Sequence, residues 1–182
     1  MQPGAITGGG VTPVAYAKRV VHSGLVRADA ETLFSYLDDH RRLSGHMTES
    51  SWKMGGGRMT IELDEGQGRL IGSHIRLGGR LFGLGLYVEA RVISRDPPVR
   101  KVWETVGEPR LLVIGRYRMG FESIATPGGR QLQVFIEYDD PLSGVPRVLG
   151  KLLGAAYARW CVRQMVEDAI TQFARLRQAT TA

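Results

Sequence analysis

The last stretch of the chain, Ser143 to Arg177, most constrains the fold because it has the pattern of one long helix. Its apolar residues recur three and four positions apart, first from Val145 to Trp160 and then from Met165 to Phe173. At about 1.5 Å per residue, a helix of this length spans on the order of 50 Å. Because that is longer than an ordinary globular helix, an extended surface must cover its apolar side.

The apolar stripe changes direction within this helix. A helical wheel centres the stripe near Leu149 and Ala156 before Trp160 and moves it round by about a third of a turn afterwards. Arg163 and Glu167 occupy the vacated face. Two interpretations are open. A bent helix, or two shorter helices, docks its tail on a different surface, which we favour; or the polar groups meet a cavity or a ligand head group.

The segments before the helix have the character of β-strands, with apolar and polar residues alternating at period two. Strands are predicted at 16–27, 58–66, 70–79, 84–94, 99–107, 111–123 and 131–141, the sixth being the longest, and two short helices at 30–39 and 40–47. Short turns between consecutive strands predict an antiparallel meander, and one-sided alternation predicts one buried face. The fold class is therefore α+β, with a curved sheet of about seven strands around the terminal helix.

Length and composition indicate one soluble domain. At 182 residues, we expect a flexible tail at 1–16 and a single domain at 17–178. Cys161 is the only cysteine, which excludes an intramolecular disulfide. No run of 18 apolar residues occurs, and the N-terminus lacks the pattern of a signal peptide. We therefore expect a cytoplasmic location.

The basic charge balance has few implications for partners. The net charge is +6, but the arginines are scattered among acidic neighbours and no nucleic-acid-binding motif is present. We expect no nucleic-acid partner. A basic surface does favour peripheral contact with anionic membranes. The sequence indicates no cofactor and no particular protein partner.

Two stretches resemble a known superfamily. VRADAETLFSYLDDHRRLSGHM (26–47) and IGSHIRLGGRLFGLGLYVEARVISRDPPVRKVWETVG (71–107) are similar to the opening and the middle strands of the START-like, polyketide cyclase/dehydrase (SRPBCC) superfamily. The resemblance covers about residues 17 to 177 and points to no subfamily. It implies a helix-grip fold with an apolar cavity between the sheet and the final helix. Members bind lipids, sterols, isoprenoid quinones or polyketides, and a minority catalyse cyclisation or dehydration.

By position in that fold, the residues expected to line the cavity come from the strands and from the last helix. They are Leu86, Val88, Trp103, Tyr117, Met119, Phe121, Val134, Ile136 and Trp160. For each of them, plain core packing is the alternative. Large aromatic and methionine side chains together suit an adaptable apolar pocket.

Few residues suggest catalysis or metal binding. His40 and His46 lie six residues apart, which fits no single helical face, so we interpret them as part of a surface helix and loop. Cys161 is expected to be a packed helix residue. We assign no catalytic residue and no metal ligand.

Glu104 is the one acidic residue with a chance of facing inward. If buried between Val102 and Val106, it would act as an acid or base. The opposite register, which we favour, places Trp103 and Thr105 inside and Glu104 outside.

Three functions remain open. The first is binding, transport or presentation of an apolar small molecule such as a lipid, isoprenoid quinone or polyketide. The second is a polyketide cyclase or dehydrase, which needs a buried acid–base pair; Glu104 with a neighbouring tyrosine is the candidate. The third is a protein-docking or membrane-recruiting role, similar to that of the recruiting component of carbon monoxide dehydrogenase, which requires an exposed apolar patch.

Overall fold

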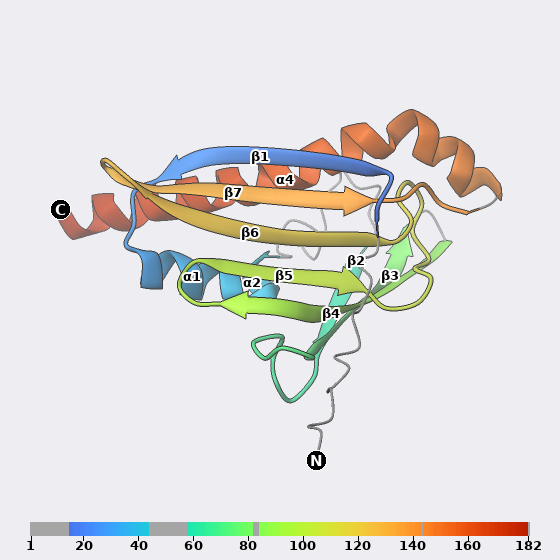
Figure 1. The fold of residues 1–182 in the computed structure, drawn as a ribbon, viewed down its shortest axis with the longest axis horizontal. Helices are drawn as coiled ribbons and strands as arrows, with labels where there is room; N and C mark the ends of the chain where they lie inside the picture. The colour runs from blue at the N-terminus through green and yellow to red at the C-terminus, as the bar shows by residue number, and fades with distance from the viewer. Residues whose placement is uncertain (1–14, 44–57, 82–83, 143, 182) are drawn as a thin grey trace, which may run out of the picture.

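A computed structural model describes residues 15–43, 58–81, 84–142 and 144–181 (Figure 1). Seven strands form one antiparallel sheet in the order β1-β7-β6-β5-β4-β3-β2. They are β1 (Lys18–Val26), β2 (Arg58–Leu63), β3 (His74–Leu81), β4 (Leu84–Asp96), β5 (Arg100–Thr105), β6 (Tyr117–Thr126) and β7 (Gly129–Tyr138). The described helices are α1 (Ala30–Asp38), α2 (His40–Leu43) and α4 (Gly144–Thr181).

This architecture confirms the predicted fold class. The strands β2 to β7 follow one another as a meander, and the curved sheet packs against one long C-terminal helix. The first strand pairs with the last, with Lys18 opposite Tyr138 and Val26 opposite Arg130. The helix α4 runs alongside these two strands and contacts both of them (Figure 1). It thereby covers one face of the sheet at the β1 edge.

The helix α1 begins as its sequence predicts. The Asp29 side chain accepts a hydrogen bond from the backbone N–H of Thr32 at 2.8 Å, which satisfies a free donor of the first turn. Leu33, Phe34 and Leu37 form its buried face. The predicted continuation of α2 to residue 47 lies outside the described residues, as do His46 and most of the N-terminal tail.

Two predicted strands start too early. Strand β6 begins at Tyr117 instead of residue 111, and β4, with 13 residues, is the longest strand. The segment before β6 leaves the sheet because Gly115 packs directly on the Asp139 and Asp140 carbonyls and donates a hydrogen bond to the former. Strand β3 begins at His74, since the residues before it form a turn in which Gly72 has φ of +90°.

The two halves of α4 present different faces to the sheet. In the second half, the apolar residues point inward as expected: Met165, Val166, Ala169 and Phe173 are buried. In the first half, small residues point inward: Gly150, Gly154 and Ala158 are buried. A Cβ atom at Gly154 would lie 2.7 Å from the Val113 carbonyl oxygen, so the helix approaches this segment closely.

The structure therefore corrects the interpretation of the stripe before Trp160. That stripe faces outward, and α4 is one continuous helix in which only the second half packs its large apolar residues. Arg163 and Glu167 form an exposed ion pair at 2.6 Å, so neither meets a ligand head group inside the protein. No helix in the described part of the chain is long and apolar enough to cross a membrane.

Candidate functional site

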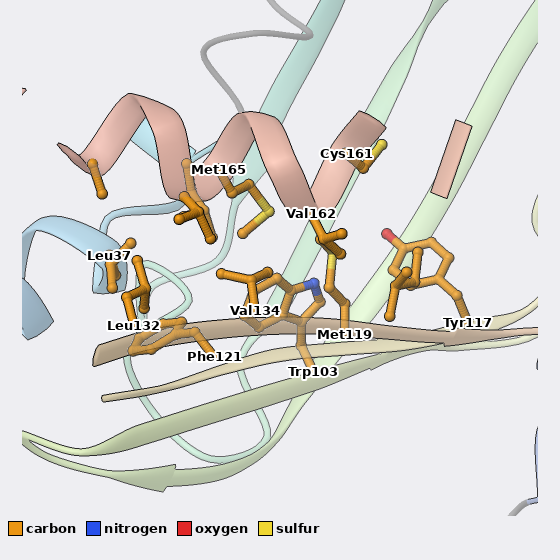
Figure 2. Close-up of a cluster of buried hydrophobic side chains, with 14 of the residues drawn as sticks. Leu37, Trp103, Tyr117, Met119, Phe121, Leu132, Val134, Cys161, Val162 and Met165 are labelled. Carbon is orange, nitrogen blue, oxygen red and sulfur yellow. The ribbon is translucent and has the colours of Figure 1, made fainter. Parts of the chain in front are cut away.

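The eight strand residues predicted to line a cavity all lie on the inner face of the sheet. Each is at most 9% exposed. Figure 2 shows Trp103, Tyr117, Met119 and Val134 projecting from the strands toward α4. The structure thus brings these residues together on one apolar surface. Whether they contact a ligand remains a prediction.

Trp160, the ninth predicted residue, lies elsewhere. Its side chain is 37% exposed and packs beside Tyr157, with the ring centroids 6.0 Å apart. The cause is the orientation of α4, which turns the apolar residues of its first half away from the sheet. The prediction that Trp160 faces the sheet is wrong.

Three uncharged polar groups lie where α4 crosses the inner end of β6. The Tyr157 and Cys161 side chains form a hydrogen bond with each other, and Tyr117 lies beside Cys161 (Figure 2). Burial raises the pKa of the Cys161 thiol to about 12 and the pKa of Tyr117 above its usual value. The nearby Cys161 and burial together raise the pKa of Tyr157 well above 10.0. All three groups are therefore neutral at physiological pH.

A charged cluster lies at the opposite end, where α1 meets the sheet. Lys101 on β5 is fully buried, and its Nζ lies 2.6 Å from Asp38 Oδ1 and 3.1 Å from the Asp38 carbonyl oxygen. Arg95 on β4 donates two hydrogen bonds to the same carboxylate, at 2.8 and 3.3 Å. Burial of Asp38 opposes its ionisation, but the bonds from Arg95 and Lys101 outweigh burial and lower the pKa of its carboxyl. This ion cluster fixes the C-terminal end of α1 to the sheet.

His40, the first residue of α2, is buried beside that cluster. It is 2% exposed, and its ring meets Trp103 edge-on with the centroids 5.0 Å apart. The other side of the ring lies against Gly68, where a Cβ atom would be 2.7 Å from His40 Cδ2. Burial, with the charge of Lys101, lowers the pKa of His40 to about 3, so the imidazole is neutral. Its Nε2 atom has no hydrogen-bond partner among the described residues.

The surface interpretation of His40 is therefore wrong. It assumed a solvated helix and loop, whereas α2 is a single turn that begins directly after α1 and directs its first side chain inward. Within the described ranges, no three His, Cys, Asp or Glu residues gather as a metal site.

Glu104 faces away from α4, as the favoured register predicts. It lies on the outer face of β5, where it pairs with Arg118 at 3.0 Å and with Arg91 at 3.9 Å. Trp103 is 5% exposed and belongs to the core on the opposite face. Glu104 is thus excluded as an interior acid or base.

Open grooves of about 710 and 430 Å³ occur where β1 ends beside the C-terminal part of α4. Leu25, Arg27 and Arg177 line both of them. None of the nine predicted ligand-binding residues contributes to either groove. These grooves are therefore separate from the predicted site.

The fold is shared with proteins of known structure. The Zhui aromatase/cyclase from Streptomyces sp. R1128 aligns with a TM-score of 0.62 and 16% identity over 87% of this chain and 94% of that one. Norcoclaurine synthase from Thalictrum flavum, in complex with dopamine and hydroxybenzaldehyde, aligns with 0.61 and 14% over 96% and 98%. Ara h 8.0201 aligns with 0.58 and 12% over 87% and 98%. No protein-family model and no curated protein matches the sequence. At these identities, the likeness establishes the helix-grip fold.

Sequence reasoning missed the ion cluster and His40, although one signal was present. The register that places Trp103 inside also places Lys101 on the same face, two residues earlier. Asp38 follows Leu37 and lies four residues after Phe34, at the edge of the buried stripe of α1. An inward lysine opposite an inward aspartate predicts a buried ion pair.

Proposed function

We propose that the protein binds an apolar small molecule against the inner face of the sheet beneath α4. The observation that supports this function is the neutrality of the polar groups there. Tyr117, Tyr157 and Cys161 retain their protons at physiological pH, so a ligand at this end meets hydrogen-bonding groups but no charge. Burying an uncharged ligand next to them requires no desolvation of an ion.

The remaining surface suits the body of such a ligand. Met119, Phe121, Val134 and Ile136 form a continuous buried apolar face with their neighbours. Each apolar side chain of this size contributes about 1.5–3 kcal/mol when it is removed from water. The charged groups at the α1 end are bonded to one another and do not need a charged ligand. A lipid, an isoprenoid quinone or a polyketide combines an apolar body with a few oxygen acceptors, as this surface requires.

The first test is native mass spectrometry of the purified protein, followed by denaturing extraction. We expect a stoichiometric apolar molecule to be released. Rebinding of that molecule should weaken about fivefold to tenfold in Tyr117→Phe, since a typical hydrogen bond contributes about 1–1.5 kcal/mol. Isothermal titration calorimetry with the extracted molecule measures the change.

Tyr87→Phe is the matched control. Tyr87 is an exposed tyrosine on β4, and its hydroxyl donates to Glu89 at 3.3 Å, away from the proposed site. Its replacement should leave affinity unchanged. A protein that carries and takes up no apolar molecule, or equal affinity of wild type and Tyr117→Phe, contradicts the proposed site.

A second candidate function, a cyclase or dehydrase, rests on His40. A buried neutral imidazole with an unpaired Nε2 beside Trp103 provides a hydrogen-bond acceptor that Glu104 cannot provide. For this function, His40→Gln should lower turnover of an aromatic polyketide precursor by at least about a hundredfold. His22→Gln on β1 is the control, and product formation is followed by mass spectrometry. Equal turnover in both variants removes this candidate.

A further inference from the structure

The first half of α4 has its large and small residues in reversed positions. Gly150, Gly154 and Ala158 pack against the body of the protein. Leu152 is 72% exposed and Val148 is 60% exposed on the opposite side. A helix of a globular protein normally turns its large apolar residues inward, as the second half of α4 does. The outward face is therefore adapted to something other than water.

The exposed apolar residues form one surface, which we call the outer face of α4. It consists of Val148, Leu152, Leu153 and Trp160, with Leu142 just before the helix. Val148, Leu152 and Trp160 follow the spacing of four and eight residues that brings side chains onto one side of a helix. A contiguous group of this kind on a surface marks an interaction site.

The charge around this surface has one sign. Arg147, Lys151 and Arg159 are exposed, and no acidic residue occurs in the sequence between Asp140 and Glu167. None of these three cations forms an ion pair with a carboxylate of the described residues. Apolar residues flanked by unpaired cations are the composition of a helix that lies in the interface of an anionic membrane.

A second copy of this chain is a poorer match. A symmetric contact through the outer face of α4 would bring Arg147, Lys151 and Arg159 near the same cations of the other copy. An anionic lipid surface instead provides phosphate groups for the cations and acyl chains for Leu152 and its neighbours.

We propose that the outer face of α4 docks the protein on anionic lipid membranes. The helix lies parallel to the membrane plane, with its glycine side toward the protein and its leucine side in the lipid. This inference stands on the exposed residues of α4 and does not depend on the site beneath the helix. The two proposals are therefore tested by different variants.

The experiment is flotation of the full chain with vesicles of phosphatidylcholine alone or of phosphatidylcholine with phosphatidylglycerol. We expect binding to the second kind only, and at least a tenfold loss of binding in Leu152→Glu. Leu176→Glu is the matched control, since it places the same charge at a 49% exposed leucine in the last turns of the same helix. Circular dichroism and thermal unfolding verify that both variants fold.

Two further measurements separate the two components of the contact. Lys151→Gln should weaken binding about fivefold and reduce its salt dependence. The vesicle-induced blue shift of tryptophan emission should disappear in Trp160→Phe. Failure to bind anionic vesicles overturns the proposal, as does binding that Leu152→Glu leaves intact. A dimer in sedimentation that Leu152→Glu dissociates, without vesicle binding, assigns the surface to a second copy and also overturns it. Retained ligand with lost vesicle binding in Leu152→Glu distinguishes this inference from the proposed function.

Discussion

Replacing Lys101 with methionine is expected to destabilise the protein by about 3 kcal/mol, at the lower end of the range for a broken buried ion pair. The Lys101 side chain is fully buried, and its two oxygen partners belong to Asp38. Without the lysine, the carboxylate keeps only its bonds to Arg95, and the Asp38 carbonyl loses a donor. Urea unfolding at pH 7 measures the change in the free energy of unfolding.

The matched control is Lys18→Met. Lys18 forms an ion pair of 2.5 Å with Asp140, but both side chains are partly exposed, so its loss should change stability by no more than about 1 kcal/mol. The double variant Asp38→Leu/Lys101→Met should be more stable than either single variant by at least about 1 kcal/mol, because it leaves neither member of the pair buried alone. Additive effects of the two substitutions would contradict a coupled pair.

Acidification from pH 7 to pH 5 is expected to destabilise the protein by about 2 kcal/mol through His40 alone. The folded protein lowers the pKa of His40 from 6.5 to about 3. Between these values the unfolded chain binds a proton that the folded chain excludes, so stability falls as the pH falls through 6.5. Each pH unit well inside this range is worth about 1.4 kcal/mol. Asp38 adds to the loss only at lower pH, since its pKa is lowered from 3.8.

Unfolding experiments at several pH values test this dependence. His40→Phe should flatten the change in stability between pH 7 and pH 5, whereas His22→Gln should leave it as in the wild type. A wild-type protein equally stable at both pH values would contradict the burial of a neutral His40.

The fold was predictable from sequence because its signals are local and repeated. Alternation placed Leu132, Val134, Ile136 and Tyr138 on the inner face, and all four are buried. The Asp29 cap and the single terminal helix were predictable for the same reason. The segment before Tyr117 was not, because its apolar residues match a strand while contacts with α4 and with residues 139–140 take it out of the sheet.

The candidate site was predictable only in part. Eight of the nine predicted residues share the inner face, because strand alternation determines their side. Trp160 was misplaced because a helical stripe shows which residues share a face, without showing whether that face is buried. His40 was misjudged because its burial depends on Trp103 and Gly68, which are distant in sequence.

The pairing of β1 with β7 has a consequence for how the chain assembles. Lys18 pairs with Tyr138, so about 120 residues must be synthesised before the first strand finds its neighbour. The helix α4 packs on these same two strands and follows them in the chain. Such long-range pairing slows folding, since a large loop closes before its contacts form. During synthesis, the first strand therefore remains unpaired until almost the whole polypeptide has left the ribosome, and the apolar side chains of the sheet are open to aggregation in that interval.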